Sequence, residues 1–276
     1  MKSSLLAGVA LAGLVGVGPA MAGNIVLTGH DNDFHYASTP ADAGPALSAE
    51  VKFVENGSAL PLLTFDAGSE LTSALTSLGI SYVNVDPSVA GNVTAGLFDP
   101  TKYSAFAVAS VTSCSGCDNT PADITNIAAQ SAAIASFFNA GGGILGLAGA
   151  TDTAAYAYVP TAASNAGGAP PSTGYVQTAA GSAFGLPAVN GDATHNFFNT
   201  PGTGGLSASY VVTETLGVGG TPETIALKGG TISCTTKGTC TIGVTASVPE
   251  PMSLALLGTG LIGLGLVRRR SLFPKG

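Results

Sequence analysis

The chain of 276 residues has no tryptophan, four cysteines and few charged residues, which make up 9% of it. Positive charge is the scarcest, since no arginine occurs between Gly23 and Glu250. The cations of that stretch are Lys52, Lys102, Lys228 and Lys237. Against 16 acidic residues they leave a net formal charge of −12. A chain without a basic surface cannot neutralise phosphates, which argues against nucleic acid as a partner.

An apolar run near the N-terminus predicts export. Lys2 precedes the run from Leu5 to Val17, and the small residues Ala20-Met21-Ala22 follow it. This order is typical of a secretory signal peptide, here residues 1–22, cleaved before Gly23. The alternative is a transmembrane anchor, but the run is short and the small-residue site is well placed. We therefore expect cleavage.

A second apolar run, Met252 to Val267, lies between Val248-Pro249-Glu250-Pro251 and Arg268-Arg269-Arg270. As a helix it is roughly 24 Å long, enough with snorkelling arginines to cross a thin bilayer core. The arginines are expected to stay in the cytoplasm, which leaves everything before Pro249 outside.

This order of motif, apolar helix and basic end resembles the PEP-CTERM sorting signal of Gram-negative bacteria, here over residues 248–276. The resemblance implies that an exosortase cuts near Pro249-Glu250-Pro251. It also implies transient inner-membrane anchoring, followed by transfer of the mature protein to the cell envelope or extracellular matrix.

The cysteines form two local pairs. Cys234 and Cys240 bracket a short polar segment between two β-rich runs, which predicts a disulfide-tied hairpin in an oxidising compartment. Cys114 and Cys117 have a spacing shared by redox motifs and half-zinc sites, but the sequence has no second such pair. For an exported chain we expect a Cys114–Cys117 disulfide that braces a loop, with redox or metal chemistry as the alternative.

Residues 23–247 are long enough for one domain, in which apolar runs alternate with amphipathic segments. The strands expected are Asn24 to Thr28, Leu60 to Phe65, Ile80 to Val85, Tyr103 to Ser110 and Ile144 to Ala148. Helices are expected over Ala46 to Glu55, from the cap Ser69 to Gly79, and from the cap Thr120 to Gly141. The alternation predicts an α/β domain with a mostly parallel sheet, right-handed crossovers and helices on both faces.

The alternation weakens after Ala150. The segment Pro160 to Gly181 is rich in small and turn-forming residues and predicts a surface loop or lid. Further strands are expected at Tyr210 to Leu216, Thr224 to Leu227, Thr231 to Cys234 and Thr239 to Thr245. They would add antiparallel strands at one edge of the sheet, the last two forming the disulfide-tied hairpin.

The segment Gly141 to Asp152, with the sequence GGGILGLAGATD, resembles the strand-to-turn segment of ThuA-like (trehalose-utilisation) proteins and, more distantly, of class I glutamine amidotransferases. The runs Ile25 to His30 and Gly79 to Val83 look similar to this superfamily as well. The resemblance implies a flavodoxin-like fold for residues 23–247. In those families the turn carries a histidine or a nucleophilic cysteine. Here the matching residue is Ala148, so that chemistry is expected to be absent.

Candidate site residues gather just beyond the first expected strand. The chain places His30, Asp31, Asp33 and His35 there, His195 in a later loop, and Asp152 after another expected strand. Ligands of open α/β sheets bind beyond the carboxyl ends of the strands, so these groups are expected at one edge. Imidazole with carboxylate suits zinc or another divalent transition metal, and carboxylate with carbonyl oxygen suits calcium.

The spacing of these residues matches no established metal motif. Two alternatives therefore stay open. In the first, Asp and Asn build an Asx turn while the histidines cap local backbone. In the second, the loops bind a carbohydrate or another ligand.

Taken together, the sequence predicts an exported, exosortase-processed protein of the cell surface or of an exopolysaccharide or biofilm matrix. Its domain is expected to be a non-catalytic binding or structural module. The alternative is a secreted metal-dependent or hydrolase-like enzyme that uses the His30 to His35 loop and His195. The expected partners are the general secretion machinery, an exosortase and matrix components such as exopolysaccharide.

Overall fold

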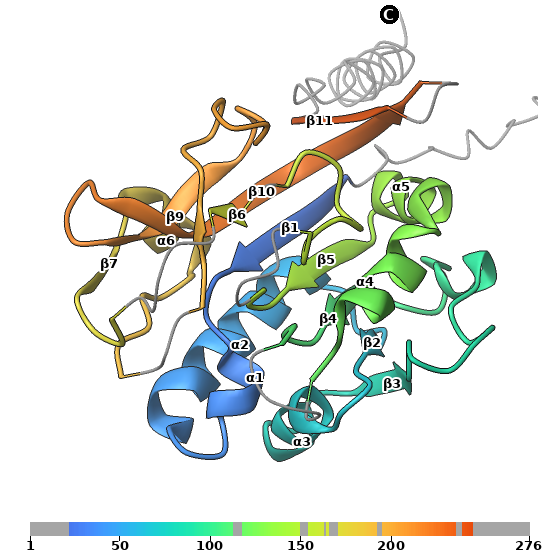
Figure 1. The fold of residues 1–276 in the computed structure, drawn as a ribbon, viewed down its shortest axis with the longest axis horizontal. Helices are drawn as coiled ribbons and strands as arrows, with labels where there is room; N and C mark the ends of the chain where they lie inside the picture. Colours follow the sequence, from blue (N-terminus) through green and yellow to red (C-terminus); the bar gives the residue numbers. More distant parts are fainter. Residues whose placement is uncertain are drawn as a thin grey trace, which may run out of the picture.

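The computed structural model describes residues 22–112, 118–149, 154–162, 164–165, 171–191, 195–235 and 239–244. A nine-stranded sheet runs through the middle of this part of the chain (Figure 1). Its parallel half has the order β3 (Tyr82–Val85), β2 (Leu62–Phe65), β4 (Ala105–Val108), β5 (Gly143–Gly146), β1 (Gly23–Thr28). Its antiparallel half continues with β10 (Thr221–Cys234), β9 (Val211–Leu216) and β7 (Tyr175–Gln177), while β11 (Cys240–Val244) also pairs with β10.

This sheet confirms the predicted mixed α/β class, the mostly parallel centre and the antiparallel strands at one edge. Strands β2 to β5 follow the 2-1-3-4 part of the flavodoxin-like order 2-1-3-4-5, and β1 occupies the fifth place. The flavodoxin-like assignment stays a prediction. A separate two-stranded ladder joins β6 (Ser164–Asn165) to β8 (Phe197–Phe198).

Helices cover both faces of the sheet, as predicted. Because side chains alternate along a strand, Leu27 of β1 packs into one core and Val26 into the other. The core that holds Leu27 lies under α4 (Pro121–Ala128) and α5 (Ser131–Asn139) and is rich in aromatic rings around Phe106. The opposite core lies under α2 (Pro40–Glu55) and α3 (Glu70–Ser77). The remaining helices are α1 (Asn32–His35), the 3-10 turn η1 (Ala95–Leu97) and α6 (Ala179–Phe184).

One predicted helix is two helices in the structure. The predicted start is confirmed, since Thr120 and Asp123 form a capping box in which each side chain satisfies the other's backbone N–H. The prediction of one continuous helix to Gly141 is wrong, because the chain turns between α4 and α5. There Gln130 leaves helical geometry, and its backbone N–H donates to the carbonyl oxygen of Ile127, three residues back.

Helix α2 begins at Pro40, six residues before the predicted start. Pro45, directly before the predicted start, lies inside the helix. Proline lacks a backbone N–H, so the second turn of α2 loses one hydrogen bond there without ending. The long apolar contacts of α2 with β1 and β5 offset this loss.

One strand prediction and one loop prediction also need correction. The runs Thr224 to Leu227 and Thr231 to Cys234 belong to the single strand β10. This strand stays continuous because it pairs with β1 up to Gly230 and with β11 from Gly230 onward. The predicted loop Pro160 to Gly181 contains β7 and the start of α6, since the edge strand β9 offers its free backbone groups to β7. Residues 163 and 166–170 of that loop lie outside the described residues.

Several predictions fall outside the part of the chain that the structure describes. These are most of the signal peptide, the Cys114 and Cys117 pair, Asp152, and the tail with Pro249-Glu250-Pro251, the run Met252 to Val267 and Arg268-Arg269-Arg270. Over the residues that are described, no helix combines the length and apolarity needed to cross a membrane.

The predicted Cys234–Cys240 disulfide is confirmed and joins directly paired residues of β10 and β11. Replacing both cysteines by serine should lower the free energy of unfolding by about 2 kcal/mol, because the bridge restricts a short loop of the unfolded chain. Urea denaturation measures this change. Thr241→Ser, an exposed change in the same hairpin, is the matched control and should leave the midpoint unchanged. An unchanged midpoint in the double serine variant would contradict the prediction.

Candidate functional site

The candidate site lies at the carboxyl end of β1, where the chain enters α1 (Figure 1). Gly29 is required at this point, because a Cβ there would collide with the Asn196 carbonyl oxygen and the Glu223 side chain. The close approach allows the His195 backbone N–H to donate to the Gly29 carbonyl oxygen at 2.9 Å. Residue 195 is thereby held beside the loop that follows β1.

The segment that carries His195 is fixed by its neighbour Asn196. The Asn196 Oδ1 atom accepts hydrogen bonds from the Gly149 N–H at 2.7 Å and from the Tyr156 hydroxyl at 3.0 Å. The Tyr156 hydroxyl also lies 2.8 Å from the carbonyl oxygen of Thr28, the last residue of β1. The ends of β1 and β5 are therefore tied to the His195 segment by buried polar contacts.

Asp31 and His35 are brought together by α1. They are four residues apart, and the His35 N–H donates to the Asp31 carbonyl oxygen, so both side chains lie on one face of the turn. Asp31 Oδ2 is 3.5 Å from His35 Nε2 and 2.8 Å from His195 Nε2. The ligand atoms of these three residues all lie within 4.8 Å of one another.

Asp31 and His195 contact each other as an ion pair, with 2.8 Å between Asp31 Oδ2 and His195 Nε2. The other carboxylate oxygen, Asp31 Oδ1, is buried and has no hydrogen-bond partner among the described residues. Asp31 is fully buried, whereas His35 and His195 are 23% and 26% exposed. The group thus has a buried base and an open side.

The spacing and donor types fit a divalent transition metal. Ligand bonds of about 2.1 Å place ligand atoms about 3.0 to 3.4 Å apart in octahedral or tetrahedral geometry. The 2.8 and 3.5 Å contacts of Asp31 bracket that range. Two imidazoles and one carboxylate suit zinc or iron(II), and three protein ligands leave coordination positions free.

The electrostatics of this group favour a cation. Contact with the Asp31 carboxylate raises the pKa of His195, and the charges of Asp118 and Asp33 add to this effect, while burial lowers it. A proton on His195 is therefore stabilised by the surrounding carboxylates. A metal ion would be stabilised by the same charges.

The other predicted residues of the loop point elsewhere. His30 is fully buried, its Nε2 atom lies 3.1 Å from Glu214 Oε2, and its ring meets Tyr175 edge to face. Asp33 accepts hydrogen bonds from the N–H and hydroxyl of Ser110, which ties α1 to the end of β4. Burial raises the pKa of Asp33 to about 7, although the bonds from Ser110 lower it.

Sequence reasoning missed three buried carboxylic acids behind the loop. Glu214 accepts hydrogen bonds from Thr224 Oγ1 and the Val189 N–H at 2.7 Å each. Glu223 has no hydrogen-bond partner for either oxygen within the described part of the chain, and burial raises its pKa well above the usual range, with a further contribution from Glu214. The available sequence signal was a glutamate inside one β-rich run, Glu214, and another directly before the next run, Glu223.

The third of these acids is Glu50, which lies on the buried face of α2. Its two oxygens lie 3.2 and 3.3 Å from the Asn32 side-chain nitrogen, which donates to them. Burial raises the pKa of Glu50 to about 8, Asn32 lowers it, and the charges of Glu214 and Asp33 raise it further.

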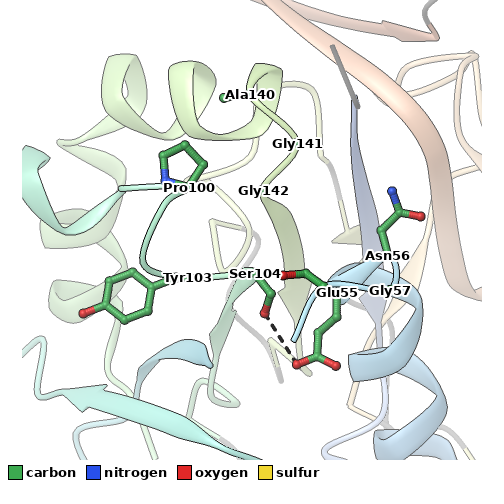
Figure 2. A pocket seen from close by; sticks show the side chains of 10 residues that line it. Glu55, Asn56, Gly57, Pro100, Tyr103, Ser104, Ala140, Gly141 and Gly142 are labelled. Atoms are coloured by element: carbon green, nitrogen blue, oxygen red, sulfur yellow. Dashed lines mark hydrogen bonds between the residues drawn. The ribbon is translucent and has the colours of Figure 1, made fainter. Parts of the chain in front are cut away.

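A cavity of about 310 Å³ lies at the opposite end of the sheet (Figure 2). It is lined by the end of α2, the segment before β4 and the turn before β5. In it the Ser104 hydroxyl donates to Glu55 Oε1 at 3.5 Å, and burial raises the pKa of Glu55. The cavity is therefore separate from the group formed by Asp31, His35 and His195.

Comparison with known proteins identifies the tail of the chain. Residues 247–270 match the family model of the PEP-CTERM protein-sorting motif, which confirms the predicted sorting signal. This motif is the recognition signal of an exosortase and implies export with a cell-surface or extracellular destination. Neither a curated protein nor a solved structure matches the chain, so the ThuA-like resemblance has no support from these comparisons.

Glu50 makes the stability of the domain depend on pH. Its pKa is about 8 when folded, against 4.5 as the ordinary value. Between these pH values the folded state holds a proton that the unfolded state has lost. Stability should therefore fall as pH rises through this window, by up to about 1.4 kcal/mol per pH unit for one group.

The variant Glu50→Gln removes this proton and should flatten the fall in stability, as measured by urea denaturation at pH 5 and pH 8. The matched control is Glu70→Gln, a change at the partly exposed start of α3, which should leave the slope unchanged. An equally steep fall in the Glu50→Gln variant would contradict this account of the buried carboxyl.

Proposed function

We propose that this protein is an exported cell-surface or matrix protein whose α/β domain binds a divalent transition-metal ion through Asp31, His35 and His195. The observation that carries the proposal is the convergence of these ligand atoms within 4.8 Å, from segments about 160 residues apart in sequence. The buried Oδ1 atom of Asp31, which has no hydrogen-bond partner among the described residues, supports a missing ligand.

The open side of the group suggests what the metal does. With three protein ligands, the remaining coordination positions can take oxygen ligands from outside the protein. Hydroxyl and carboxylate groups of an exopolysaccharide are such ligands, and the exported location brings them within reach. The metal then serves as a non-catalytic link between the domain and a matrix polymer.

The residue at the end of β5 supports a non-catalytic role. Ala148 is fully buried, and its backbone N–H donates to the carbonyl oxygen of His30 at 3.1 Å. A methyl group at this position offers neither a nucleophile nor a ligand. Chemistry of the ThuA-like or amidotransferase kind therefore has no reacting group there.

A metal-dependent hydrolase is the second candidate function, and the same open coordination favours it. Catalytic zinc sites commonly use three protein ligands and hold a water molecule in the fourth position, where its pKa falls to about 7. The nearby carboxylates would then act on that water. The two functions share the metal site and differ in turnover.

Metal binding is tested by titrating Zn²⁺ into the purified protein and measuring bound metal by elemental analysis. The variants His35→Gln and His195→Gln should each weaken binding more than about 100-fold, because the loss of a ligand exceeds the 10- to 100-fold effect of losing a supporting contact. His30→Gln is the matched histidine control and should bind as the wild type does. No bound zinc in the wild type, or an equal loss in the His30→Gln variant, would overturn the proposal.

Turnover separates the two candidate functions. The zinc-loaded protein is assayed with neutral ester, amide and glycoside substrates beside the His35→Gln variant. Turnover that is lost with the metal would establish the hydrolase. Metal binding without turnover, combined with metal-dependent retention on an acidic polysaccharide, would establish the linking role.

The sorting motif predicts removal of the tail. In a host with an exosortase, the exported protein should lack Arg268-Arg269-Arg270, and mass spectrometry of the mature form reads this directly. Glu250→Ala, which alters the motif, should leave the tail attached, whereas Ser253→Ala in the apolar run should be processed normally. A mature wild-type protein that still carries Arg268 would refute processing at this motif.

A further inference from the structure

The first strand residue and the last strand residue of the described domain lie beside the same residue of β10. Gly23, the first residue of β1, and Val244, the last residue of β11, are both paired with Gly230 of β10, one on each side. We call this region, defined by Gly23, Gly230 and Val244, the tail end of the domain.

The sorting motif starts at the tail end. It begins at residue 247, three residues after Val244. Three residues extend the chain by no more than about 10 Å, which limits the distance between Val244 and the start of the motif. Asp31 lies beyond the other end of β1, and six residues of strand separate the two regions by about 20 Å. The candidate metal ligands and Val244, the last described residue before the tail, are therefore at opposite ends of β1.

The charges of the domain are divided in the same way. The three lysines among the described residues, Lys52, Lys102 and Lys228, are all exposed and all lie toward the tail end. Lys52 is in the last turn of α2, Lys228 is two residues from Gly230, and Lys102 precedes β4. A hydrogen bond from the Asn24 side chain to the Phe53 carbonyl oxygen confirms that the end of α2 lies beside the start of β1.

Acidic residues gather at the opposite end. They follow the carboxyl ends of the parallel strands or lie in the first turns of helices. Asp42, Glu70 and Asp86 are exposed or partly exposed, whereas Asp31, Asp33, Asp66, Asp118 and Asp123 are buried. At the tail end, Asp99 pairs with Lys102 at 3.4 Å, and Glu55 has its pKa raised by burial. Among the described residues, the exposed lysines thus lie at one end of the domain, and Asp42, Glu70 and Asp86 place negative charge on the surface of the other end.

We propose that the tail end of the domain lies against the surface of an anionic phospholipid bilayer while the tail anchors the protein. Anionic lipid attracts exposed lysines and repels carboxylates, so the division of charge and the exit of the tail favour the same orientation. The edge that carries Asp31, His35 and His195 then faces away from the membrane. This proposal rests on the matched sorting motif and the strand register, and it holds whether or not the edge binds a metal.

The orientation is tested with the full chain anchored by its tail in vesicles of phosphatidylcholine and phosphatidylglycerol. A donor fluorophore is attached through azidophenylalanine in place of Ser58, exposed at the tail end, or of Ser38, exposed after α1. Energy transfer to an acceptor on the lipid headgroups should be higher from position 58 than from position 38. Equal transfer, or higher transfer from position 38, would overturn the proposal.

Charge variants test the contact with anionic lipid. In the triple variant Lys52→Gln, Lys102→Gln and Lys228→Gln, the difference in energy transfer between positions 58 and 38 should be lost. It should also be lost for the wild type in high salt, where charges are screened. The matched control makes the same change in net charge at the other end, with Ala37→Asp, Ser69→Asp and Ala122→Asp, and should keep the difference. A difference that persists unchanged in the lysine variant would show that the tail alone orients the domain, and would overturn the lipid contact.

Discussion

The pairing of β1 on both of its edges is the interaction on which the rest of the structure depends. On one side β1 runs parallel to β5, and on the other it runs antiparallel to β10. It therefore joins the helix-covered parallel half of the sheet to the antiparallel half. Because all six of its residues are buried, β1 cannot shift by one residue without moving Ile25 and Leu27 out of their core. The register fixes what lies at each end of the strand.

At the carboxyl end of β1, this register concentrates acidic side chains in an interior to which no lysine of the described segments contributes. The buried groups divide into two kinds. Asp31 and Glu214 are matched with histidines, whereas burial raises the pKa of Asp33, Glu50 and Glu223. Burying a carboxylate without a partner costs several kcal/mol, so such a group either holds a proton or lies beside a cation. On the proposed function, the open group around Asp31 is the place where an external cation reaches this charge.

Local sequence signals were enough to predict much of the fold. The apolar runs of β2, β4 and β5 and the cap at Thr120 act within a few residues, so they were visible in the sequence. The break between α4 and α5 and the continuity of β10 depend on contacts between distant segments. These features could not be predicted from periodicity alone.

The candidate site was predictable in outline and not in detail. The polar loop after β1 and His195 were identified because polar groups at strand ends meet at one edge of a sheet. His35, and not His30, lies beside Asp31 and His195 because of the single turn of α1 and the hydrogen bond from the His195 N–H to the Gly29 carbonyl oxygen. Neither feature could be predicted from the sequence. Glu50, Glu214 and Glu223 escaped notice because a glutamate in an amphipathic helix or strand is normally exposed.

The three proposed metal ligands come from two distant parts of the chain, and this links the proposed metal site to folding. Asp31 and His35 come from one turn, but His195 reaches them only after β1 has paired with β5 and β10. The unfolded chain therefore lacks the complete site, and a metal that binds the folded domain stabilises it by mass action. Without a bound cation, the buried Oδ1 atom of Asp31, which has no hydrogen-bond partner among the described residues, opposes folding at a cost of about 1 to 3 kcal/mol. On the proposed function, the supply of metal outside the cell then sets the stability of the exported domain as well as its ability to bind.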